Sequence, residues 1–295
     1  MNSTSSTGPT TSTGSSGSTG STSRTPTATL RLGDADLSEI APLGRGHRSA
    51  YFRAWHGPTG RLLAIRQILP DAPDPAPELA RMRALLARRD ALGHPNLRAP
   101  ITTLRIARLG ELPHAELLAL EFVDANPRST KPLAIPELVE LVRGAARGLR
   151  HLHATGLVHG RVAPHAFLRT PTGRLKIASL GDLTRAGTPH PTLRKRPGLI
   201  APEMAAKEPL TPETDSFLLA VTTLLFATGR WPAAAAAVPC RENAPLASTG
   251  LVLPALPAAT LCPELPHAIA AFCDEALASD PTRRPPVTHL HASLG

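Results

Sequence analysis

The sequence predicts an α+β protein in which a small β-rich region comes before a larger helical region. Two β-rich runs between Leu30 and Ile68 flank Gly44-Arg45-Gly46, and a second hairpin turns at Pro58-Thr59-Gly60. By contrast, Ile135 to His153 has apolar residues at helical spacing, and Phe217 to Phe226 is apolar apart from two threonines. At 295 residues, the chain has room for one unit of two lobes or for two small domains.

The composition narrows the class of protein. Hydrophobic residues make up 42% of the chain and aromatic residues only 3%, so Leu, Ala and Val must fill the core. The net charge of +9 favours acidic partners, but no DNA-reading motif or aromatic–basic interleaving accompanies it, so we expect no nucleic-acid partner. No segment approaches the ~20 apolar residues that cross a bilayer, and an apolar signal core is missing. Cys240, Cys262 and Cys273 form no CxxC pair and are an odd count, which favours a reduced, cytoplasmic protein. Because no segment is long enough to cross a bilayer, we also expect no membrane partner.

The chain begins with a tract of Ser, Thr and Gly that runs from Met1 to about Ala28. Such a tract buries too little surface to offset its chain entropy. We therefore expect residues 1–28 to be a disordered tail and residues 29–295 to form the folded domain. A solubilising linker and a phosphoacceptor arm are two alternative roles for the tail.

The β-rich region contains the strand Ala64-Ile65-Arg66, in which alternation turns Ala64 and Arg66 toward the same side. Pro77 to Leu92 is predicted to be a helix, because its leucines and Met82 form one apolar stripe. The apolar strand from Leu117 to Val123 then runs into Asp124, where we place the connection between the two regions.

The helical region begins with the amphipathic segment from Ile135 to His153. A second helix is predicted to start at Thr211-Pro212-Glu213, where Thr supplies a cap, Pro suits the first position, and an acid lies in the first turn. A third helix covers Pro266 to Ala278. The Ala/Pro-rich segment from Trp231 to Pro257 gives no structural signal.

The stretch from Leu157 to Leu183 resembles the catalytic loop and metal-binding turn of eukaryotic-like (Hanks-type) Ser/Thr protein kinases, which read H-R-D-L-K-P-E-N-I-L and then K-L-I-D-F-G. Other motifs of that family follow in order, with H-P-N at residues 94–96, A-P-E at 201–203 and D-P-x-x-R-P at 280–285. The resemblance covers about Leu30 to Gly295. It implies a two-lobed kinase-like fold with an N-lobe at about 30–123 and a C-lobe at about 127–295.

The reactive positions of that family are replaced in this chain. Arg161 stands in place of the catalytic aspartate, Ala163 of the lysine, Ala166 of the metal-binding asparagine, and Ser179 of the second aspartate. Arginine stays protonated and accepts no proton, and Mg²⁺ needs oxygen ligands that alanine lacks. We therefore expect no intact catalytic residue and no metal site.

The resemblance also implies a ligand-binding cleft between the two lobes, and the residues on its N-lobe side differ from the family as well. Arg66 replaces the strand lysine, and the glutamate that would pair with it is expected about nine residues before His94, where Leu85 stands. Glu78 lies two turns too early, so we expect no carboxylate to meet Arg66. Tyr51 replaces the small valine that lies over adenine, and its ring either takes up part of the adenine space or turns outward.

The resemblance implies two sets of site residues. Glu121 to Val123 would form the hinge between the lobes and offer backbone groups to a ligand, and Asp215 would hold the backbone of the catalytic loop. The candidates for nucleotide or anion binding are Gly44, Gly46, Ala64, Arg66, Glu121, Val123 and Leu168. The residues that hold the fold are His159, Asp215, and the pair formed by Glu203 and Arg284.

The charge of the cleft follows from these replacements. Arg66 and Arg161, with Arg45 and Arg48 in the loop above, would share a cleft without acidic partners and repel one another. We expect such a cleft to open, to be covered by the activation segment, or to hold an anion. The alternative is that each arginine extends into solvent.

A chain that keeps the frame of a kinase and loses its reactive groups is interpreted as a pseudokinase. We expect a regulatory or scaffolding module that binds another protein, such as an active kinase or an acidic or phosphorylated segment, and that needs no cofactor. One alternative is a Ser/Thr kinase with rearranged catalytic residues, for which Asp182 is the nearest carboxylate. Another is an inert domain that binds ATP weakly and without Mg²⁺.

Overall fold

The computed structural model describes residues 37–46, 48–69, 75–109, 112–123, 132–170, 172–190, 200–229 and 257–294. The predicted tail, the connection at Asp124 and most of the Ala/Pro-rich segment lie outside these ranges.

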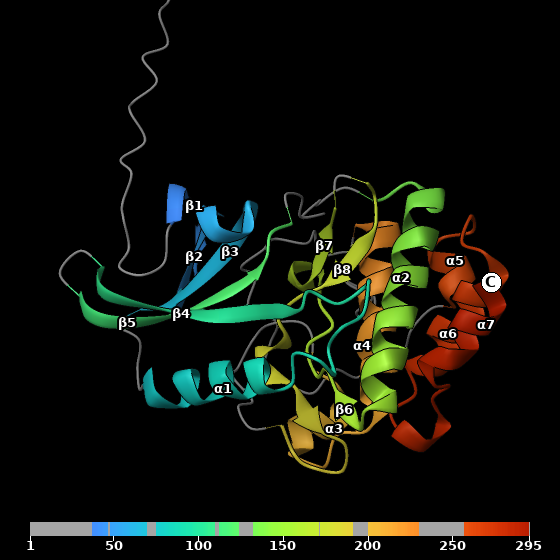
Figure 1. Cartoon of the computed structure of the whole chain (residues 1–295). Coiled ribbons are helices and arrows are strands. Elements are labelled where there is room, and N and C mark those ends of the chain that lie inside the picture. The colour runs from blue at the N-terminus through green and yellow to red at the C-terminus, as the bar shows by residue number, and fades with distance from the viewer. Residues whose placement is uncertain are drawn as a thin grey trace, which may run out of the picture.

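The N-terminal lobe is built on a five-stranded antiparallel sheet, as expected (Figure 1). Alternation along β3 places Leu63 and Ile65 in an apolar cluster on one face, while Ala64 belongs to the main core on the other face. The strands, in their order across the sheet, are β1 (Leu37–Arg45), β2 (Ser49–His56), β3 (Arg61–Ile68), β5 (Leu112–Glu121) and β4 (Pro100–Leu109).

One helix, α1 (Pro75–Ala87), lies alongside this sheet and packs against β3 and β4 (Figure 1). It begins before and ends before the predicted Pro77–Leu92. After Ala87 the chain continues in turns, in which the Leu92 amide donates to the carbonyls of Arg88 and Arg89. Leu92 is nevertheless fully buried, so the apolar stripe is correct although the helix stops earlier.

The C-terminal lobe is mainly helical and lies beside the sheet (Figure 1). Its long helices agree with the predicted ones to within a few residues. The helices are α2 (Ile135–Ala154), α3 (Pro202–Ala206), α4 (Pro212–Thr228), α5 (Ala258–Leu261), α6 (His267–Ala276) and α7 (Val287–Leu294). Two short antiparallel pairs complete it, β6 (Leu157–Val158) with β9 (Thr184–Arg185) and β7 (Phe167–Arg169) with β8 (Leu175–Ile177). Within the described ranges, no helix is both long and apolar enough to cross a membrane.

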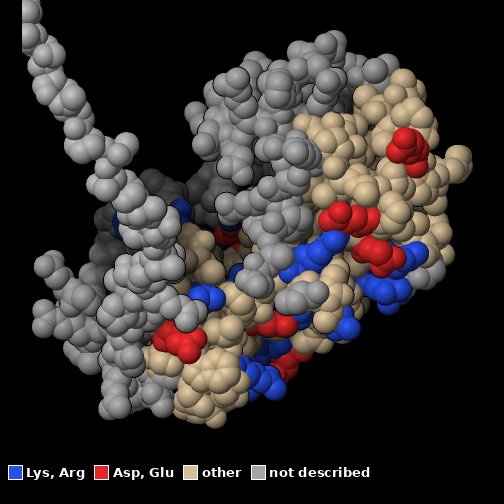
Figure 2. Space-filling view, turned by 90° about the horizontal axis from the view of Figure 1, so that it is seen from above, with Lys and Arg blue, Asp and Glu red and all other residues tan. Residues whose placement is uncertain are grey.

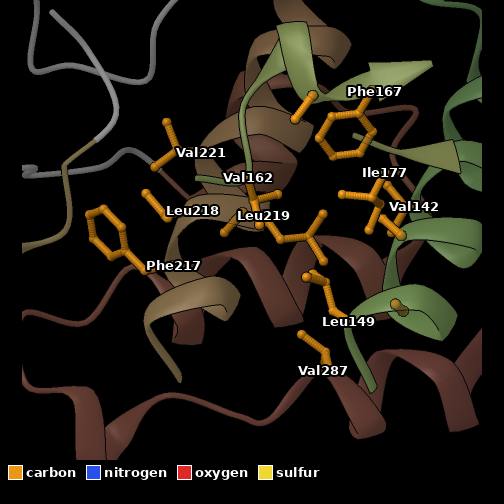
Figure 3. Packing of buried hydrophobic residues seen from close by; sticks show 14 of the residues in the cluster. Val142, Leu149, Val162, Phe167, Ile177, Phe217, Leu218, Leu219, Val221 and Val287 are labelled. Atoms are coloured by element: carbon orange, nitrogen blue, oxygen red, sulfur yellow. The ribbon is translucent and has the colours of Figure 1, made fainter. Parts of the chain in front are cut away.

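The largest apolar cluster among the described residues extends through both lobes. It runs from Ala64 of the sheet through Met82 of α1 into α2 and α4. Figure 3 shows its centre, where Phe167 meets aliphatic side chains of α2, α4 and β8. Every residue of α4 from Thr214 to Ala227 is buried, which explains why its sequence lacks the polar face of an amphipathic helix.

The segment that follows α1 is fixed to the C-terminal lobe. Asn96 accepts the Ile177 amide through its carbonyl, and the Arg98 amide donates to the Ile177 carbonyl, both at 2.8 Å. Gly148 of α2 permits this approach, because a Cβ atom there would lie 3.1 Å from the Asn96 carbonyl oxygen. The segment that connects α1 with β4 is thus hydrogen-bonded to β8 of the C-terminal lobe.

Candidate functional site

Asp215 organises the loop that carries the former catalytic positions. Its carboxylate is fully buried in the first turn of α4 and accepts the amides of His159 and Gly160, both at 2.8 Å, as predicted. His153 Nε2 also lies 2.8 Å from Asp215 Oδ2. Gly160 has a φ of 62°, and a side chain there would approach His190 and Leu210 to 3.1–3.2 Å. The loop is therefore held in one conformation.

Glu203 and Arg284 form the buried ion pair that the resemblance implied. Arg284 donates both terminal nitrogens to the two carboxylate oxygens, at 2.7 and 2.9 Å, and its Nε donates to the Ala278 carbonyl. The guanidinium also lies over the ring of Phe217. Burial would raise the pKa of the Glu203 carboxyl, but the hydrogen bonds and charge of Arg284, together with hydrogen bonds from the Glu203 amide and Thr214, lower it.

His159 is a fully buried, neutral member of the same loop. Its Nε2 donates to the Ala178 carbonyl at 2.9 Å, while its Nδ1 accepts the Arg161 amide at 3.1 Å, so both ring nitrogens are satisfied only in this tautomer. Burial lowers the pKa of the imidazole, although Asp215 and the Ala178 carbonyl oppose that effect.

The lowered pKa of His159 predicts a loss of stability between pH 7.5 and 5.5. Below the ordinary histidine pKa of about 6.5, the unfolded chain binds a proton that the folded chain does not. The free energy of unfolding therefore decreases as the pH decreases, by at most about 1.4 kcal/mol per pH unit. Urea unfolding at several pH values measures this slope. The slope should decrease in His159→Asn and persist in His289→Asn, where the side chain is exposed. An equal slope in both variants would contradict this assignment.

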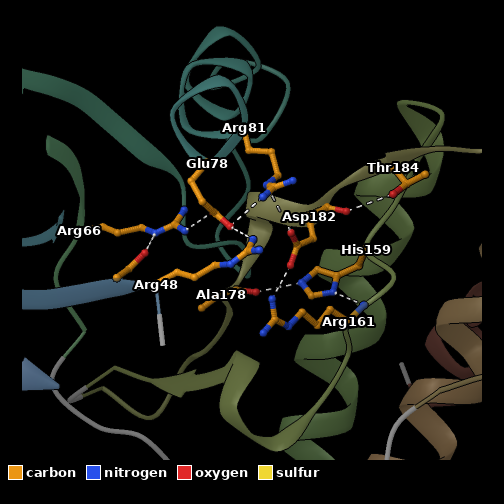
Figure 4. Close-up of polar contacts among 10 residues, drawn as sticks. Arg48, Arg66, Glu78, Arg81, His159, Arg161, Ala178, Asp182 and Thr184 are labelled. Atoms are coloured by element: carbon orange, nitrogen blue, oxygen red, sulfur yellow. Dashed lines mark hydrogen bonds and ion pairs between the residues drawn. The ribbon is translucent and has the colours of Figure 1, made fainter. Parts of the chain in front are cut away.

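The former catalytic positions hold no carboxylate, amide or imidazole side chain. Ala163 and Ala166 are buried methyl groups, and Ser179 has a left-handed backbone with a φ of 63°. Arg161 forms an ion pair with Asp182, three residues after Ser179 (Figure 4). These residues do not fit a Mg²⁺ site. The carboxylate closest in sequence to Ser179 is that of Asp182, and the guanidinium of Arg161 already neutralises it.

Arg66 has a carboxylate partner, which corrects the expectation that none was placed to meet it. Its terminal nitrogen lies 3.0 Å from Glu78 Oε2, and its Nε donates to Ser49 Oγ at 3.0 Å (Figure 4). The prediction relied on the family's spacing of about nine residues before His94 and on a helix that ran to Leu92. In the structure α1 ends at Ala87, and Glu78 in its first turn reaches Arg66 on β3.

The other arginines of the cleft are paired as well, so the expectation of unpaired, repelling arginines is wrong. The Glu78 carboxylate also accepts hydrogen bonds from Arg48 and, at 2.7 Å, from Arg81. Arg48 lies in the loop between β1 and β2, which we call the glycine loop after Gly44 and Gly46. Arg81 Nε lies 4.0 Å from Asp182 Oδ1, which connects this group to the Arg161 pair. Burial would raise the pKa of Glu78, but the hydrogen bonds and charges of its arginines lower it.

We call these six residues the arginine network: Arg48, Arg66, Glu78, Arg81, Arg161 and Asp182 (Figure 4). Four cations and two anions leave it with a net charge of +2, and it links the glycine loop, β3, α1 and the former catalytic loop. The Nε groups of Arg48, Arg81 and Arg161 are buried without a hydrogen-bond partner. The two carboxylates hold the four arginines together, and these three Nε groups are enclosed within the network.

The remaining candidates lie in the N-terminal lobe, at the hinge and on β7 of the C-terminal lobe. Gly44 lies near the end of β1 and Gly46 directly follows that strand; both are exposed, and the Gly46 amide donates to the Ser49 carbonyl. Ala64 is fully buried on β3, and Glu121 ends β5. The apolar residues Val123, Leu168 and Ala178 are buried in one small cluster between the hinge and the C-terminal lobe.

Sequence reasoning overlooked Arg98 and Arg81 and gave Glu78 no role. Arg98 Nε donates to the Glu121 carbonyl at 2.8 Å, and Lys176 Nζ lies 2.6 Å from Glu121 Oε2. The position of Arg98, two residues after the H-P-N motif, was a signal that could have identified it. The contacts of Arg81 depend on the rotation of α1, which the sequence does not specify.

A model of the protein tyrosine and serine/threonine kinase family matches residues 87–294. This match agrees with the two-lobed fold and with the buried contacts of Asp215 and of the Glu203–Arg284 pair in the C-terminal lobe. The chain belongs to the protein kinase family.

Several kinases are similar to the chain. PknA, a serine/threonine-protein kinase of Mycobacterium tuberculosis (strain H37Ra), is 26% identical over 186 residues, which is 59% of this chain and 42% of PknA. The probable serine/threonine-protein kinase PknB of Lactococcus lactis is 22% identical over 65% of this chain and 31% of its own length. PLK5 of Mus musculus, named an inactive serine/threonine-protein kinase, is 27% identical over 84% of this chain and 40% of its own length. The chain spans less than half the length of these relatives.

Proposed function

We propose that this chain is a pseudokinase that does not transfer phosphate and that regulates or scaffolds another protein. The observation that supports the proposal is the ion pair between Arg161 and Asp182. A cation stands where the base of a kinase would be, and it neutralises the carboxylate on which a rearranged kinase would depend.

The expected loss of rate is large. Losing a general base costs ~10²–10⁴ in rate, and losing metal neutralisation removes several kcal/mol more, at about 1.4 kcal/mol for each tenfold change. Together, these losses would lower a working rate of ~10 per second by about 10⁶-fold, to about one event per day.

Purified protein is therefore expected to show no autophosphorylation, and no transfer to generic substrates, above an Arg161→Ala variant prepared in the same way. The measurement is radiolabel transfer from ATP with and without Mg²⁺. Labelling that depends on Mg²⁺ and disappears in Asp182→Asn would contradict the proposal and favour a rearranged kinase.

The partner that we propose is a protein with an acidic or phosphorylated segment. The net charge of +2 in the arginine network favours it, because arginine binds phosphate and carboxylate through paired hydrogen bonds without a metal. The charge of the whole chain does not define a patch as clearly, since basic and acidic side chains lie next to one another on the face in Figure 2.

A phosphoserine peptide tests this partner class. Calorimetry should detect binding that weakens with salt and falls at least tenfold in an Arg48→Ala, Arg161→Ala double variant. Arg83→Ala is the matched control, because that side chain is 62% exposed and pairs with Glu116 outside the network. Binding that is equal in all variants would place the partner surface elsewhere and leave the inactivity unaffected.

A further inference from the structure

Arg98 occupies a backbone group that the hinge would otherwise offer to a ligand. The Glu121 carbonyl is an acceptor of the hinge, and Arg98 Nε donates to it at 2.8 Å. Lys176 holds the Glu121 carboxylate at 2.6 Å, so both the backbone and the side chain of this residue are engaged from within the chain. An adenine amino group is also a donor, and it would compete with the guanidinium for the same oxygen.

Tyr51 faces the cleft and does not turn outward. Its Cα lies directly opposite that of Arg66 in the β2–β3 pair, and residues that pair across an antiparallel ladder point to the same face. Arg66 points into the cleft, toward Glu78 and against Gly181, where a Cβ atom would lie 3.3 Å from it. Accordingly, Tyr51 is partly buried and packs against the main core that contains Ala64 and Leu120.

The guanidinium of Arg98 is half-buried beside the Glu121 carbonyl. Burial lowers the pKa of this guanidinium, and the nearby Tyr51 and Glu121 oppose that effect.

The apolar walls of this region are closed. Val123, Leu168 and Ala178 are only 8%, 9% and 5% exposed, and they contact one another across the gap between the hinge and β7. A flat aromatic ligand needs apolar surfaces that are accessible on both sides and a few free polar groups. Here the surfaces are covered, and Arg98 holds a hinge carbonyl.

We infer that Arg98 and Tyr51 fill the nucleobase pocket of this kinase fold and exclude adenine from the hinge. The two lobes would stay linked without a nucleotide, because Arg81 Nε of α1 lies 4.0 Å from Asp182 Oδ1 of the C-terminal lobe. This inference extends the proposed function but does not rest on it, since an inactive cleft with an open pocket would still bind adenosine.

Adenosine is the probe that tests the pocket alone, because it has no phosphate to bind the arginine network. Calorimetry without metal should detect no binding to the wild type at millimolar adenosine. A Tyr51→Val, Arg98→Val double variant, in which the ring and the fork are removed, should bind adenosine at least tenfold more tightly than the wild type. Arg53→Val on β2 is the matched control, since it removes an exposed arginine, and it should behave as the wild type.

Three results would overturn the inference. The first is saturable adenosine binding to the wild type, a result that needs no variant to fold. The second is a folded double variant that binds no better than the wild type. If the double variant does not fold, the single variants Tyr51→Val and Arg98→Val should each show part of the gain, and no gain in either folded single variant would be the third. Phosphate transfer by the wild type, by contrast, contradicts the proposed function through a separate measurement.

Discussion

Replacing Arg284 with alanine is expected to lower the free energy of unfolding by about 3–5 kcal/mol, because removing one partner strands the other charge in the interior. Both side chains of the Glu203–Arg284 pair are almost fully buried, at 2% and 0% exposed. The substitution also removes the donors to the Ala278 and Ser279 carbonyls and the cation above Phe217. Urea or thermal unfolding of the purified variant measures the loss.

Arg283→Ala provides a matched control one residue away. Its side chain is exposed, so we expect a change within about 0.5 kcal/mol. Arg284→Lys should lie between the two, since it keeps the charge and loses the paired geometry. If Arg284→Ala unfolded within about 1 kcal/mol of Arg283→Ala, the pair would not stabilise the lobe as its burial suggests.

Replacing Asp215 with alanine is expected to cost about 2–6 kcal/mol, because two buried amides lose their acceptor at about 1–3 kcal/mol each. Those amides belong to His159 and Gly160, so the former catalytic loop should lose its fixed conformation as well. Hydrogen exchange at the two amides should accelerate more than exchange in α6, which lies in another part of the lobe.

Two variants bracket this result. Asp90→Ala removes a carboxylate that is 96% exposed and should leave both stability and exchange unchanged. Asp215→Asn keeps one oxygen for one amide and should have an intermediate effect. Slow exchange at His159 and Gly160 in Asp215→Ala would show that other contacts hold the loop.

The features that could be predicted are those set by local pattern or by residues at fixed motif positions. The stripe of Ile135 to His153 predicted α2 to within one residue, because helical spacing of apolar side chains is a local property. The pairing of Glu203 with Arg284 and the position of Asp215 against the loop came from the family pattern, and the geometry agrees with both.

The partners of the cleft arginines were the least predictable feature. The sequence reveals which charges are present, but which of them meet depends on where α1 starts and how it is rotated against the sheet. Glu78 was set aside by counting residues, although it binds three arginines. Arg98 was overlooked for a similar reason, since its contact with the Glu121 carbonyl forms only when two distant segments are side by side.

By itself, the sequence determined the kinase-like frame, the helices of the C-terminal lobe and the loss of the reactive groups at Arg161, Ala166 and Ser179. These follow from residue type and spacing along the chain. Only the tertiary structure decided that the arginines are paired and that Arg98 and Tyr51 face the hinge and the cleft. The physical reason is range, because an ion pair is fixed by a few ångströms between side chains, and small shifts of a helix on a sheet exchange one partner for another.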